Sequence, residues 1–407
     1  MKKVFKRALC SLIAVGSMAA LSAVDFGGMI TNDSKLSGNK FDKMLLEQKN
    51  AISAWLRIPF NPKGTTYLAA EGMYLFHEKG IKLFGDAEEN VRYTGSVDLN
   101  LLKFATTMKK DFGQVSISAG RFFSSDLSGL AYAQTADSVL ASIELSRFNL
   151  SVYGAYTGLL NARTVSMINN TFSLKEGKIE KENVFGAEDD EKHYQRAEDY
   201  IVGSAIVSFP YLFANQTVSA QFLGTFHVKD TSFTRMYAEL SIGGPLVSTL
   251  YYNVNTTFGF TSYDGSSMDV SNLSKAVLSY YNVDAKNLAI NLAAIYASGD
   301  SGLKPFTGFT SQTATNALSG RTEYSGLLKA SLLASCKPIQ KLLLGANADL
   351  IFNAAESIKY EGFQYGANVN WQIVSDISLA LSMYQYFDKD DSARDKSCVQ
   401  LKAAISF

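Results

Sequence analysis

Histidines, cysteines and paired carboxylates do most of the catalysis and metal binding in proteins, and this sequence is poor in usable arrangements of them. Its three histidines, His77, His193 and His227, are far apart in the chain. A histidine beside an aspartate or serine could form an acid–base pair or hold a metal. However, no HExxH, GxSxG or Cys/His ligand spacing accompanies any of the three. We therefore predict no enzymatic activity, no bound metal and no cofactor.

Two acidic groups could have another use. Carboxylates are the ligands that Ca²⁺ prefers, so the aspartates near residue 390 could bind a divalent cation weakly. A second acidic run, at 188–191, lies in a long polar segment at 159–198. Runs of like charge usually mark solvated loops, which is the interpretation we favour, and surface binding or adhesion is the alternative for 159–198. The aspartates of the first group are Asp388, Asp390, Asp391 and Asp395.

The overall composition excludes several classes of protein. The 407 residues carry 38 basic and 38 acidic side chains, so the chain is not a strongly basic nucleic-acid binder. Aromatic residues make up 12%, which is unlike a disordered chain. Beyond residue 23 no apolar stretch is long enough for a membrane-spanning helix.

The N-terminus has the three parts of an export signal. Basic residues within 2–7 precede an apolar run at 9–21, which is too short to span a membrane as a helix. Small residues then supply a cleavage site after Ser22 or Ala23. We predict that 1–23 is a cleaved signal peptide.

The remainder, 24–407, alternates with a period of two residues. Between 363 and 373, apolar residues such as Val369 alternate with polar ones such as Asn370. Since successive side chains of a strand point to opposite faces, each such segment is a strand with one apolar face. The other face is rich in Gly, Ser, Asn and Gln, which suits a wet, crowded interior. The apolar face is rimmed by Tyr, Phe and Trp, as at a lipid boundary.

The connections between these strands are of two kinds. We predict about 18 strands, with 16 as the alternative if the first is a plug or tail. The predicted strands are 24–31, 50–60, 66–77, 92–104, 112–122, 136–146, 148–158, 199–210, 216–227, 234–243, 248–262, 273–283, 286–298, 322–334, 339–352, 359–373, 375–388 and 397–407. Short links fall at 61–64, 147, 243–245, 283–285, 337–338 and 374. Longer links fall at 32–49, 78–91, 123–135, 159–198, 263–272, 299–321 and 389–396.

Short turns at one end and long loops at the other are typical of a membrane barrel. In hydrocarbon every backbone N–H and C=O needs a protein partner, so a spanning sheet must close on itself. We therefore predict a single all-β domain at 24–407. It is a transmembrane antiparallel up-and-down β-barrel with short periplasmic turns and long extracellular loops. This topology separates Cys336 from Cys398 by the length of the barrel, too far for a disulfide.

The last strand carries a family resemblance. Val399, Leu401, Ala403, Ile405 and Phe407 share one face, and the chain ends on that Phe. This resembles the C-terminal signal by which the barrel-assembly machinery recognises bacterial outer-membrane barrels, and the whole mature chain resembles the porin superfamily. The resemblance implies a location in the bacterial outer membrane, contact with its lipid and, as barrels of this size often show, a homotrimer.

Strand parity also assigns charges to the lumen. Five bases against six acids predict no strong ion preference from the wall alone. A loop at 124–135, with Asp126, is similar in position to loops that porins fold inward to narrow the pore. The predicted lumen-lining charges are Arg57, Arg235, Lys329, Lys341 and Lys402, and Glu71, Asp98, Glu144, Glu239, Glu323 and Asp349.

The sequence thus favours a channel for passive diffusion of small hydrophilic solutes, filtered by size and modestly by charge. One alternative is a plugged or closed barrel, with 32–49 in the plug, acting as an adhesin or a hydrophobic-solute transporter. Another is a secreted soluble β protein. No nucleic acid is expected as a partner.

Overall fold

The computed structural model describes residues 24–39, 43–85, 91–165, 172–175, 178–181, 193–229, 233–263, 267–300, 302–310 and 325–407. Over these ranges the chain is almost entirely β-structure, and the one short helical turn is Ser392–Arg394. None of the described residues belongs to a helix long and apolar enough to cross a membrane. The predicted signal peptide at 1–23 lies outside the described residues.

Eighteen strands form one antiparallel sheet, and two more form a separate hairpin. The sheet contains β1 (Asp25–Asn39), β2 (Lys43–Pro59), β3 (Thr66–Gly85), β4 (Arg92–Lys110), β5 (Gly113–Ser125), β6 (Ala133–Leu145), β7 (Asn149–Tyr156), β10 (Tyr200–Phe213), β11 (Gln216–His227), β12 (Phe233–Val247), β13 (Leu250–Tyr263), β14 (Asp269–Asn282), β15 (Leu288–Ala297), β16 (Leu327–Ile339), β17 (Leu342–Asn353), β18 (Lys359–Val374), β19 (Ile377–Asp388) and β20 (Lys396–Ser406). The hairpin contains β8 (Phe172–Lys175) and β9 (Lys178–Lys181).

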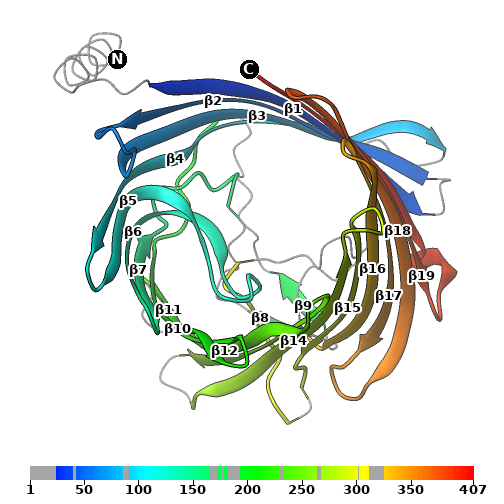
Figure 1. Ribbon diagram of the computed structural model, residues 1–407. Helices are drawn as coiled ribbons and strands as arrows, with labels where there is room; N and C mark the ends of the chain where they lie inside the picture. Colours follow the sequence, from blue (N-terminus) through cyan, green and yellow to red (C-terminus); the bar gives the residue numbers. More distant parts are fainter. Residues whose placement is uncertain are drawn as a thin grey trace.

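The sheet closes into a barrel because its first and last strands pair (Figure 1). The pairing of β1 with β20 runs from Met29 and Ser406 to Gly38 and Ser397. Phe407 extends it, since its N–H donates to the Gly28 carbonyl at 3.0 Å and its own carbonyl accepts from Gly28 at 2.9 Å. This confirms the predicted fold class, with eighteen strands rather than sixteen.

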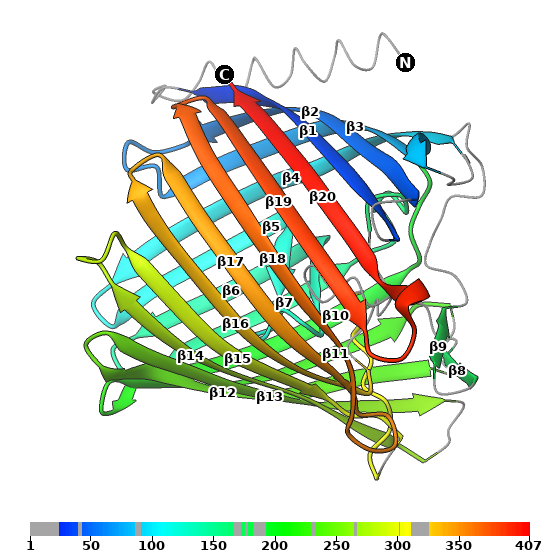
Figure 2. The ribbon, with the colours of Figure 1, turned by 90° about the vertical axis from the view of Figure 1, so that its right-hand side faces the viewer.

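The two ends of the barrel differ, as Figure 2 shows. At one end, called the short-turn end below, short turns join the strands. The start of β1 and the end of β20 also lie at this end. The other is called the long-loop end. Three predicted turns were wrong, because 243–245, 337–338 and 374 belong to strands and the turns follow at 248–249, 340–341 and 375–376. Glycine and proline misled the prediction, since Pro245 and Pro338 both sit at register shifts that strands tolerate.

The predicted link at 32–49 was also wrong. Asn32 pairs with Asn50 in the β1–β2 ladder, and pairing continues to Asn39 and Lys43, so the described residues of this segment belong to the wall rather than to a plug. The Asn32 amide donates to the Asn50 amide oxygen at 2.7 Å. Similarly, β3 continues to Gly85 through most of the predicted 78–91 loop.

Alternate residues of the wall lie in two environments. Val139 and Leu240 are 55% and 56% exposed, whereas the adjacent Ser138 and Glu239 are buried. The buried parity of β12 contacts segments inside the barrel, so the exposed apolar parity faces outward. Contiguous apolar surface of this extent, around a closed sheet, is typical of contact with lipid.

One hairpin leaves the wall. Pairing between β4 and β5 stops at Leu102 and Arg121. Pairing between β6 and β7 stops at Asp137 and Tyr156. Beyond these points β5 and β6 pair only with each other, and their hairpin lies inside the barrel (Figure 1).

The gap that the hairpin leaves is closed by the two ends of the loop between β7 and β10. Ala162 N–H donates to the Gln195 carbonyl at 2.7 Å, and Ala197 N–H donates to the Leu160 carbonyl at 2.9 Å. The backbone N–H of Val97 in β4 donates to the carbonyl of His193, in the same loop, at 3.2 Å. The predicted solvated loop at 159–198 is therefore part of the wall at both its ends, while its acidic run at 188–191 lies outside the described residues.

Gly120 permits the bend in β5. Its φ of 117° is one that other residues rarely adopt, and a Cβ there would lie 1.9 Å from the Leu102 carbonyl oxygen. We expect Gly120→Val to prevent assembly of most of the protein, measured as the fraction that migrates as a folded barrel on unheated gels. Gly154→Val is the matched control, because no atom lies within 4 Å of a Cβ at Gly154. Equal folded fractions for the two variants would contradict this assignment.

Candidate pore constriction

The inward hairpin docks on the inner faces of β11 and β12. Leu127 N–H donates to the Gln221 side-chain oxygen at 2.7 Å. Asp126 is 5% exposed and accepts from Tyr132 N–H at 2.7 Å and from Ser128. Asp126 therefore organises the tip of the hairpin, and Leu127 attaches that tip to the wall.

A second internal segment, 302–310, packs against the first. Phe309 N–H donates to the Ala131 carbonyl at 2.7 Å, and Ala133 N–H donates to the Thr310 hydroxyl at 3.0 Å. This segment falls in the predicted loop at 299–321, and its role inside the barrel was not predicted. Its two phenylalanines, Phe306 and Phe309, are unusual in a solvated loop and could have revealed it.

Two inward side chains of β12 hold the second segment. Arg235 is 1% exposed and donates to the Gly308 carbonyl at 2.9 Å. Tyr237 donates its hydroxyl to the Thr307 carbonyl at 2.8 Å. Arg235, predicted as a charge of the lumen wall, is thus covered by the segment that it binds.

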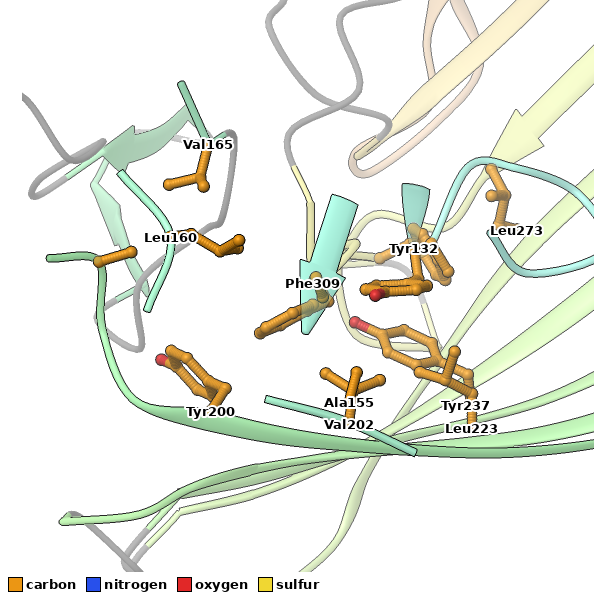
Figure 3. Packing of buried hydrophobic residues seen from close by; sticks show 14 of the residues in the cluster. Tyr132, Ala155, Leu160, Val165, Tyr200, Val202, Leu223, Tyr237, Leu273 and Phe309 are labelled. Atoms are coloured by element: carbon orange, nitrogen blue, oxygen red, sulfur yellow. The ribbon is translucent and has the colours of Figure 1, made fainter. Parts of the chain in front are cut away.

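An aromatic cluster joins both segments to the wall (Figure 3). The rings of Tyr132 and Phe309 stack at 6.0 Å, and Tyr200 meets Phe309 edge-on at 5.0 Å. The hydroxyls of Tyr132 and Tyr153 lie 2.9 Å apart. Burial, and secondarily the neighbouring Tyr153, raise the pKa of Tyr132 well above its usual value, so its hydroxyl remains neutral. Buried aromatic contacts of this kind make the narrowing a packed part of the fold.

Arg121 stands where the hairpin leaves the wall and is 6% exposed. It binds Asp137 through two nitrogens, at 2.9 and 2.7 Å, and lies 3.4 Å from Asp98. It also donates to the Leu159 carbonyl at 2.8 Å, and Asp98 accepts from Thr164. Asp98 was predicted as a lumen charge, but Arg121, the centre of this cluster, was missed although it lies in strand β5 beside Gly120.

The remaining predicted lumen charges are distributed along the barrel. Lys329 and Asp349 are both buried and their charged atoms lie 3.6 Å apart. Glu71 accepts from Asn100 at 3.3 Å. Toward the short-turn end, Arg57 lies over the Tyr67 ring at 4.4 Å, Glu144 accepts from Gln114 at 3.2 Å, Lys341 donates to the Ile373 carbonyl at 3.3 Å and Lys402 lies 3.5 Å from Asp33. Glu323 lies outside the described residues.

The histidines are not grouped. His77 contacts Glu47 at 2.8 Å and lies within β3 rather than at the predicted strand end, because that strand is longer than expected. His227 contacts Glu198 at 3.0 Å, and His193 packs on the Tyr74 ring. In the part of the chain that the structure describes, no three His, Cys, Asp or Glu side chains are arranged to hold a metal.

The aspartates near residue 390 hold their own loop. Asp395 accepts from the backbone of Asp388 at 3.0 Å, and Arg394 lies within 4.0 Å of Asp388.

The two described cysteines, Cys336 toward the short-turn end and Cys398 toward the long-loop end, are free, as the topology predicted.

Comparison with known proteins identifies the fold. No protein-family model and no curated protein matches the sequence. Among solved structures, Pseudomonas aeruginosa OccK5 (OpdH) has a TM-score of 0.59 at 10% identity, covering 96% of this chain and 99% of that one. OpdQ of the same organism gives 0.59 at 10% identity, covering 95% and 99%. The chain shares the fold of these proteins. The outer membrane protein opdK, also from Pseudomonas aeruginosa, is similar with a TM-score of 0.53 at 12% identity over 94% of this chain and 99% of that one.

Proposed function

We propose that this protein is an outer-membrane channel through which small hydrophilic solutes diffuse passively. The observation that carries the proposal is the contrast between the two faces of a closed eighteen-stranded sheet. Its outward parity is apolar, and its inward parity holds hydrogen-bonded polar side chains and two packed segments, 126–132 and 302–310. At this strand number, wall side chains alone are too short to fill the lumen.

The segments on the inner wall give the channel its filter. They pack against the inner faces of β7 and β10–β12, so they narrow the lumen from that side. Solutes would be selected by size at this narrowing and by the charged side chains around it. The similarity in fold to outer membrane protein opdK supports the same location for this chain.

We further propose export through the segment at 1–23 and assembly through the C-terminal strand. Phe407 supports the second point, because its backbone completes the pairing with β1 and its ring is 73% exposed. A recognition signal that also forms the closing strand would let the machinery hold the edge of the sheet until it pairs.

The decisive test is conductance of the purified protein in a planar lipid bilayer. We expect discrete, long-lived open steps, and loss of permeation above a limiting sugar size in vesicle-swelling assays. A barrel that is correctly folded, judged by its gel migration, yet electrically silent would contradict the channel and favour the closed barrel. Recovery in aqueous extract without detergent would contradict the membrane location.

A further inference from the structure

The inner wall contains a hollow of about 500 Å³ near the short-turn end, away from the constriction. It lies over the inward faces of β1 and β16–β20. Three small residues that lie in register across β19 and β20, Ser378, Ala380 and Ala404, form part of its floor. The hollow exists because these side chains do not reach into the lumen.

Strand parity establishes that these residues face the lumen. Leu381 and Leu401 are 48% and 44% exposed and belong to the outward apolar parity of β19 and β20. Ala380 and Lys402, one position removed from each, therefore point inward. The same alternation separates outward Val369 from Asn370, which lines the hollow.

The charged groups around the hollow are mostly basic. Lys337, Lys341 and Lys402 line it, against the single carboxylate of Asp33. Lys402 lies 3.5 Å from Asp33, whose other oxygen accepts from Gln400 at 2.7 Å. Three ammonium groups minus one carboxylate leave an excess of two positive charges.

Two of the lysines have no acidic partner within the described ranges. Lys341 donates to the neutral Ile373 carbonyl at 3.3 Å, and Lys337 enters no ion pair among the residues that the structure describes. Charges of one sign in a concave wall concentrate the field and attract ions of the other sign. Lysine is well suited to this role, because its ammonium supplies three donors on a flexible stem.

We propose that this hollow binds a small oxyanion, a carboxylate or phosphate group, between Lys341, Lys337 and Lys402. The Asn370 side-chain amide lies on the same floor and supplies a neutral donor. The inference deepens the proposed channel function and rests on it. A solute that has passed the constriction would dwell here before it leaves at the short-turn end, which the proposed orientation places in the periplasm.

The test uses the intact protein in a planar bilayer in sodium chloride, with inorganic phosphate or acetate added to one side. We expect saturable reduction of the chloride current by one or both anions. The combined variant Lys337→Gln, Lys341→Gln and Lys402→Gln should raise the half-blocking concentration roughly tenfold, since it removes all three ammonium groups and partly exposed charge pairs are individually weak. Comparing phosphate with acetate separates the two ligand classes.

Lys63→Gln is the matched control, because Lys63 lies in the β2–β3 turn at the same end and outside the hollow. Asp33→Asn should act in the opposite direction and lower the half-blocking concentration, because it releases Lys402. A conducting channel with no saturable block, or equal block in the triple variant, would overturn this inference and leave the channel function intact. A wild-type barrel without conductance would instead overturn the proposed function.

Discussion

Replacing Arg121 with methionine is expected to destabilise the barrel by about 3 kcal/mol, because it leaves the Asp98 and Asp137 carboxylates without their shared cation in a largely buried site. The side chain of Asp98 is 9% exposed and that of Asp137 is 27% exposed, so the first carboxylate suffers more. The loop carbonyl of Leu159 also loses one of its two donors and keeps the Tyr194 hydroxyl. Urea titration of the protein in detergent or lipid measures the change in the free energy of unfolding.

Arg147→Met provides the matched control, because Arg147 is an exposed cation in the short turn between β6 and β7. Adding Asp98→Asn and Asp137→Asn to the Arg121 variant should recover part of the lost stability, since the uncompensated charges are then absent. Equal free energies of unfolding for Arg121→Met and Arg147→Met would contradict a stabilising role for the Arg121 cluster.

Removing the tip of the inward hairpin is expected to widen the pore. Ser125 and Ala133 are paired across the hairpin, so residues 126–132 can be replaced by Asn-Gly, which favours a two-residue turn. The change removes the attachment to Gln221 and the contacts of Ala131 with 302–310. We expect a larger single-channel conductance and passage of larger sugars in the swelling assay.

Tyr132→Phe is the control for this variant. It keeps the ring that stacks on Phe309 and removes only the hydroxyl contact with Tyr153. Its conductance should equal that of the wild type. An unchanged conductance in the shortened protein, with normal folding on gels, would mean that 126–132 does not limit the pore.

The wall of the barrel was largely predictable because lipid and water impose a strict alternation on each strand. The predicted strands 216–227 and 359–373 agree closely with β11 (Gln216–His227) and β18 (Lys359–Val374). The prediction failed where that constraint ends. In the outer part of β1 and β2 the alternation breaks down, since Met44, Leu45 and Leu46 are consecutive apolar residues among polar ones, so the segment at 32–49 was assigned to a loop.

The interior was less predictable, since its contacts join distant parts of the chain. The inward position of 124–135 was proposed by resemblance, and the structure lays it along β11 and β12. The second internal segment, 302–310, has no alternation of period two, and its two phenylalanines were the one signal that could have marked it. Arg121 also escaped notice, because parity in a strand says nothing about a bend at Gly120 or about a loop that returns to fill the resulting gap.

The interlock between the two internal segments limits how such a pore can be redesigned. Ala133 and Thr310, which share a hydrogen bond, are 177 positions apart in sequence. If either segment alone were transplanted into another barrel, its backbone N–H groups would lack the hydrogen-bond acceptors that the other segment supplies here. Permeability in this scaffold is therefore a property of matched segments that must be exchanged together.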